Sequence, residues 1–111
     1  MTALAAIEAV VERGGDADDV LREVVSILHA ELGRFVRISF VEEGRLEPGP
    51  AAGEHEPVTG VPITWEGRRV AELEIGGEQS QGDRELLERV AALVSPYALV
   101  GWDTGGEAWL P

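Results

Sequence analysis

Residues 60–75 read Gly-Val-Pro-Ile-Thr-Trp-Glu-Gly-Arg-Arg-Val-Ala-Glu-Leu-Glu-Ile, two alternating stretches on either side of a short turn. Every second residue is apolar on both sides of Glu66-Gly67, which is typical of two β-strands that each bury one face. The turn predicts an antiparallel hairpin. Pro62 has no amide hydrogen to donate, so its strand is expected at an edge of the sheet or at a bulge.

A second alternating stretch lies upstream, beginning at Val36. Val36, Ile38 and Phe40 share one face, and Arg37, Ser39 and Val41 lie on the other. Glu43-Gly44 predicts a turn, and residues 45–47 predict a short second strand. Residues 48–57 contain three prolines and two glycines, which indicates a loop.

Helical patterns flank the two hairpins. Residues 2–13 form an Ala-rich apolar stripe that ends at a pair of glycines, and residues 16–32 form a stronger stripe that ends at Gly33. Asp16 is expected to cap this second helix. Residues 80–83, Ser-Gln-Gly-Asp, resemble a capping box before a third helix, in which Pro96 predicts a kink.

The elements predict an α+β fold, an antiparallel sheet of four or five strands with three helices packed on one face. Residues 1–100 form one domain, and residues 101–111 form a C-terminal tail. Trp102 and Trp109 in that tail are expected either to fold back on the domain or to dock on a partner. The predicted core contains Val36, Ile38, Phe40, Leu73 and Ile75 from the strands, with Leu21, Val25, Leu28, Leu87 and Val94 from the helices.

The charge of the chain excludes several classes of function. It has 111 residues, with 21 acidic residues against 9 basic ones and a formal net charge of -12. Such a chain repels a nucleic-acid backbone and an anionic membrane surface. No apolar stretch approaches the roughly 18–20 residues that span a bilayer, and no secretory signal is evident, so a cytoplasmic location is expected. The initial Met and the ordinary tail slightly favour a complete small protein.

Four stretches in this order resemble the pieces of a GAF domain, a small-molecule sensor module related to PAS. Residues 19–33 resemble its second helix, and residues 36–46 resemble its first hairpin. Gly60-Val61-Pro62-Ile63 with residues 67–73 resembles its last hairpin, and residues 80–92 resemble its closing helix. The resemblance spans roughly residues 2–100 and implies a profilin-like antiparallel sheet.

The chain departs from the family in the segment that roofs the ligand pocket. GAF domains usually have a long stretch with short helices between the two hairpins, but here only residues 48–57 are available. The sheet face that would line the pocket is polar rather than apolar, as a small-molecule site would require. We therefore expect that face to be open to solvent, or covered by the tail or a partner. Its residues are Arg37, Ser39, Pro62, Thr64, Glu72 and Glu74.

No residue pattern indicates an enzyme or a cofactor. The chain has 0 Cys, which excludes disulfides, thiolate metal sites and the cysteine-dependent activities of the GAF family. His29 is interpreted as a boundary residue of the second helix, and His55 as part of a solvated acidic loop. Glu72 and Glu74 share a strand face, where Arg37 is expected to neutralise them.

Two functions remain open from the sequence. The first is a non-catalytic regulatory or protein-interaction module that dimerises through its first and last helices, as the family often does. The second is a small-molecule sensor with a reduced, open pocket. No catalytic residue, metal or cofactor is expected, and a protein partner other than a second copy stays possible. The expected dimer interface consists of Leu4, Ile7, Val11, Leu93, Tyr97 and Val100.

Overall fold

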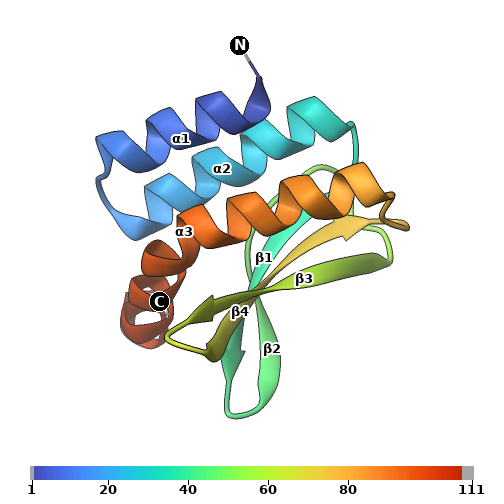
Figure 1. Ribbon diagram of the computed structural model, residues 1–111. Helices are drawn as coiled ribbons and strands as arrows, with labels where there is room; N and C mark the ends of the chain where they lie inside the picture. Colours follow the sequence, from blue (N-terminus) through green and yellow to red (C-terminus); the bar gives the residue numbers. More distant parts are fainter. Residues whose placement is uncertain (1, 109–111) are drawn as a thin grey trace.

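A computed structural model describes residues 2–108, with side chains up to Val100. The chain runs from two helices through four strands to a long helix (Figure 1). Helix α1 spans Ala3–Arg13, and the Oγ1 of Thr2 caps it by accepting a hydrogen bond from the Ala5 amide at 3.1 Å. Helix α2 spans Ala17–Leu32 and ends at Gly33 with a φ of 67°. Asp16 occupies the N-cap position, but its side chain makes no capping hydrogen bond, so the expected role for its carboxylate is wrong.

The four strands form one antiparallel sheet. They are β1 (Val36–Glu42), β2 (Arg45–Ala52), β3 (Val58–Trp65) and β4 (Arg68–Gly76), in the order β2-β1-β4-β3. β1–β2 and β3–β4 are tight hairpins, and both residues of each turn have positive φ, as the twist of paired strands favours. β1 and β4 therefore occupy the centre, and β2 and β3 are the edges.

Strand β2 is longer than the sequence predicts. Residues 48–52 were expected in a loop, but they continue β2 and pair with β1. Pro48 and Pro50 are compatible with this strand because β2 is an edge, where a missing amide hydrogen breaks no ladder. Pro62 likewise lies on an edge, β3, as expected.

The connection between the hairpins is consequently only residues 53–57. It crosses one end of the sheet, from the β2 edge to the β3 edge. Two close approaches fix its path: a Cβ on Gly53 would lie 2.7 Å from the His29 ring, and a Cβ on Gly76 would lie 2.2 Å from the Glu56 side chain. The Gly77 amide also donates to the Pro57 carbonyl at 2.9 Å.

Helix α3 spans Gln81–Ala108 and bends along its length, with Pro96 in its interior (Figure 1). The predicted capping box begins it: the Ser80 amide donates to Asp83 Oδ2 at 3.1 Å, and the Asp83 amide donates to Ser80 Oγ at 3.0 Å. The helix continues through residues 101–108, so that part of the expected tail is helical. Trp109 lies outside the described residues, as do the details of the Trp102 side chain.

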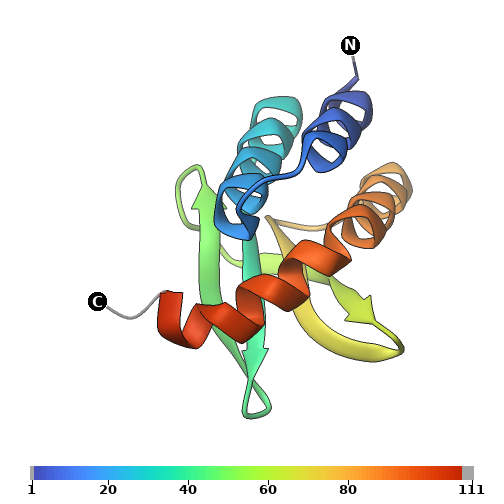
Figure 2. The same ribbon diagram turned by 90° about the vertical axis from the view of Figure 1, so that its left-hand side faces the viewer.

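All three helices lie on one side of the sheet (Figures 1 and 2). α2 and α3 contact the strands, and α1 packs on α2 and α3 as an outer layer. Every predicted core residue is buried, in a cluster that joins the helices to one sheet face. The fold expectation of three helices on one face is confirmed.

Candidate binding surfaces

The polar face of the sheet is closed by its own side chains. Arg37 Nε donates to Glu74 Oε1 at 2.8 Å, and Ser39 Oγ donates to the same oxygen at 2.6 Å. The Arg37 and Glu74 side chains are only 17% and 6% exposed, and Ser39 is buried. The cross-strand register explains the meeting, because Arg37 stands directly opposite Glu74 in the β1–β4 ladder.

The rings of Phe35 and His55 cover the polar face next to Arg37, at the start of β1. The Arg37 guanidinium lies over the Phe35 ring, 5.5 Å from its centroid, and His55 meets the same ring edge-on at 5.2 Å. The short connection between the hairpins therefore contributes His55 as a cap over Phe35.

The other residues expected on this face are placed differently. Glu72 forms an ion pair with Arg69 at 3.2 Å rather than with Arg37, so Arg37 neutralises only one of the two glutamates. Thr64 is exposed. A Cβ on Gly60 would lie 2.8 Å from the Glu72 carboxylate, which shows how closely Glu72 covers β3. The expected exposure of this face is wrong for Ser39 and Glu74, which are buried.

The residues expected at a helical dimer interface divide into two groups. Ile7 is fully buried in the core, so its assignment to an outer surface is wrong. Tyr97 donates from its hydroxyl to the Val11 carbonyl at 3.0 Å, which ties α3 to α1 within one chain. Leu4 and Leu93 are half-buried, and Val100 is 50% exposed.

A groove of about 310 Å³ lies between α1 and α3. We call it the helix groove; it is lined by Leu4, Glu8, Arg89, Ala92 and Leu93. Its floor is apolar, and one acidic and one basic side chain stand on its opposite walls. Its apolar residues, Leu4, Ala92 and Leu93, come from both helices.

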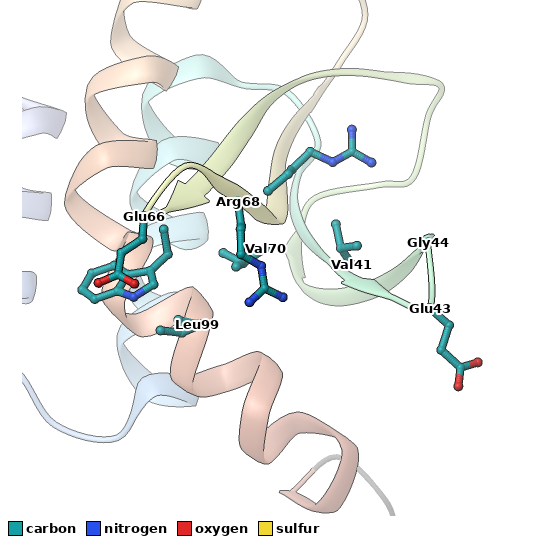
Figure 3. Close-up of a pocket in the computed structure, with 9 residues that line it drawn as sticks. Val41, Glu43, Gly44, Glu66, Arg68, Val70 and Leu99 are labelled. Atoms are coloured by element: carbon teal, nitrogen blue, oxygen red, sulfur yellow. The ribbon is translucent and has the colours of Figure 1, made fainter.

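A second concavity, of about 460 Å³, lies between the tips of the two hairpins and the bent half of α3 (Figure 3). We call it the hairpin hollow. It arises because β1 and β4 pair only as far as Phe40 and Ala71 and then diverge. Its apolar lining is Val41, Trp65, Val70 and Leu99, and its charged lining is Glu43, Glu66, Arg68 and Arg69.

An ionic cluster ties the start of β1 to the start of α3. Arg34 donates from Nη1 to Asp83 Oδ2 at 2.8 Å and from Nη2 to the Glu78 carbonyl. The Ser80 amide lowers the pKa of Asp83 below its ordinary range; partial burial opposes the shift, and the Arg34 guanidinium adds to it. The Nδ1–H of His29 donates to the Arg34 carbonyl at 2.8 Å, so this histidine is the structural boundary residue that its sequence context indicates.

The described part of the chain contains neither a cluster of metal-binding side chains nor a membrane-spanning helix. Among residues 2–100, no three His, Asp or Glu side chains gather as a metal-ligand set. No helix in the described ranges is long and apolar enough to cross a bilayer.

The comparisons with known proteins establish the fold. No family model matches the chain, and no curated protein matches it. Among solved structures, the chain is similar to the GAF domain from Acinetobacter phosphoenolpyruvate-protein phosphotransferase. The TM-score is 0.76, with 93% of this chain and 94% of that chain covered at 12% identity. The expected α+β, GAF-like fold is confirmed.

Proposed function

We propose that this chain is a non-catalytic regulatory or protein-interaction module that works as a homodimer through α1 and α3. The observation that carries the proposal is the helix groove, an apolar strip with Glu8 on one wall and Arg89 on the other. Neither side chain has an ion-pair partner among the residues that the structure describes. A two-fold axis through the groove would place Glu8 of one copy opposite Arg89 of the other, twice.

The side chains of the polar sheet face support a non-catalytic function. Paired carboxylates do acid–base work when one of them is free to exchange a proton with a substrate. Glu74 instead accepts two hydrogen bonds from Arg37 and Ser39, and Glu72 pairs with Arg69. Both carboxylates thus act as internal structural groups.

Sedimentation of charge-reversal variants tests the homodimer. We expect the wild type to be dimeric at high micromolar concentration. Glu8→Arg and Arg89→Glu should each weaken the dimer at least tenfold, because each reversal juxtaposes two pairs of like charges. The double variant Glu8→Arg/Arg89→Glu should restore the dimer, since it restores both pairs with the signs exchanged.

Two further variants complete this test. Glu31→Arg, an equal change of charge at an exposed position of α2, should leave the dimer unchanged. Leu93→Glu should give a folded monomer, because Leu93 is half-buried in the groove, whereas Ile7 is a core residue and unsuitable. A monomeric wild type, or a double variant no better than the single ones, would overturn the proposal.

A second candidate function, small-molecule sensing through an open pocket, is favoured by one observation. The hairpin hollow is a concavity of ligand size between the described side chains. It lies at the hairpin tips and not over the Arg37–Glu74 pair.

A further inference from the structure

Arg68 is one of two cations that form no ion pair with the described residues. All nine basic residues are arginines, and seven of them form ion pairs with Asp or Glu side chains. The two without an ion-pair partner in the described part of the chain are Arg89, in the helix groove, and Arg68, in the hairpin hollow. Arg68 has neither an ion pair nor a side-chain hydrogen bond with any described residue, although carboxylates outnumber guanidiniums more than twofold.

The surroundings of Arg68 have the form of a small-molecule site. Its guanidinium extends between Val41 and Leu99, and Val70 lies behind it (Figure 3). The hollow, about 460 Å³, falls in the range of roughly 300–1,000 Å³ that is typical of ligand pockets. A guanidinium beside apolar walls is suited to a ligand that has one anionic group on an apolar body.

The other charges at the hollow restrict that anion to a single negative charge. Among the described residues that line the hollow, Arg69 is already paired with Glu72, which leaves the Arg68 guanidinium for the ligand. Glu43 and Glu66 stand at opposite margins, and the Glu43 carboxylate points outward (Figure 3). A second negative charge on the ligand would be repelled by the Glu66 carboxylate at the margin and by the net charge of -12.

We propose that the hairpin hollow binds a small monocarboxylate with an apolar body, whose carboxylate pairs with Arg68. The apolar body lies against Val70, Leu99 and the half-buried Trp65. This proposal rests on the sensing candidate and is independent of the homodimer, because the hollow and the helix groove share no residue.

Calorimetry with three matched probes tests the charge requirement. 3-Phenylpropionate should bind with a measurable heat at millimolar concentration, and its uncharged amide, 3-phenylpropionamide, should bind about tenfold more weakly or worse. Phenyl phosphate, which carries nearly two charges at pH 8, should also bind more weakly than the carboxylate. Equal binding of acid and amide, tighter binding of phenyl phosphate, or no binding of the acid would each overturn the proposal.

Variants and amide chemical shifts test the location. Arg68→Met should lower the affinity for 3-phenylpropionate about tenfold, whereas Arg84→Met, at the opposite end of α3, should leave it unchanged. Circular dichroism checks that both variants fold, as expected for exposed arginines. The ligand should shift the amide signals of Val70 and Leu99 and not those of Leu4 and Leu93. Shifts confined to the helix groove would overturn the assignment, and sedimentation of the same samples reports separately on the dimer.

Discussion

Arg37 stabilises the polar sheet face through its buried ion pair with Glu74. Removing the cation leaves a carboxylate that is 6% exposed without its partner. Breaking a buried pair in this way costs about 3–5 kcal/mol. We therefore expect Arg37→Met, which keeps the apolar stem, to lower the free energy of unfolding by that amount in urea denaturation.

The surface pair Arg84–Glu88 gives the matched control for this prediction. Both of its side chains are half exposed, so Arg84→Met should cost about 0–1 kcal/mol. The double variant Arg37→Met/Glu74→Gln should recover part of the loss, because the uncompensated charge is gone. Equal losses in Arg37→Met and Arg84→Met would contradict a structural role for the buried pair.

The sequence predicts the pairing of Arg37 better than its burial. Alternation alone places Arg37, Ser39 and Glu74 on one face, which is correct, because the period of a strand is two. Their burial depends on the register of β1 against β4 and on His55 reaching Phe35 from the short connection. These are long-range contacts that no local pattern encodes, so the face was expected to be more open than it is.

Among the secondary-structure elements, the start of α3 is expected to give the clearest pH dependence of folding stability. The pKa of Asp83 is lowered in the folded protein, so the unfolded chain binds this proton more tightly. The Asp83 carboxylate thus adds stability that is complete above the ordinary aspartate pKa of about 3.9 and is lost as the pH falls through the lower folded value. Asp83→Asn should destabilise the protein at pH 7 by about 1 kcal/mol, and the deficit should disappear in strong acid.

Urea titrations of wild type and Asp83→Asn at several pH values between about 2 and 7 measure this difference. Asp19→Asn is a suitable control, because Asp19 is exposed in the first turn of α2. Asp19→Asn should lower the free energy of unfolding by less than Asp83→Asn does, because Asp19 contributes only through the helix dipole, about 0.3–1 kcal/mol. A deficit in Asp83→Asn that is constant with pH would show that its carboxylate does not stabilise the folded state as an anion.

The element boundaries show where local signals succeed. The capping box of α3 and both two-residue turns were predicted from their residues, because such signals act over three or four positions. Pro48 and Pro50 misled the prediction of β2, since the same residues are typical of loops and of edge strands. Only the order of the strands in the sheet distinguishes an edge strand from a loop here. The hairpin hollow was not predicted either, because it depends on where β1 and β4 stop pairing.

At the scale of the whole molecule, the net charge of -12 is a stability term. The longest dimension is 33 Å, close to the Debye length of about 30 Å at 0.01 M salt. At that ionic strength most carboxylates repel one another across the fold, and about 0.5 M NaCl screens them. We expect the melting temperature to rise by several degrees over this range. A fall would mean that the surface ion pairs outweigh the excess of carboxylates.

The prolines at the two sheet edges affect how copies of the protein associate at high concentration. Pro48 and Pro50 lie on β2, and Pro62 lies on β3, so each margin of the sheet is interrupted by at least one residue without an amide hydrogen. Copies that collide edge to edge therefore find no continuous template on which to polymerise. We therefore expect the folded protein to resist edge-to-edge growth into fibres on both sides of the sheet.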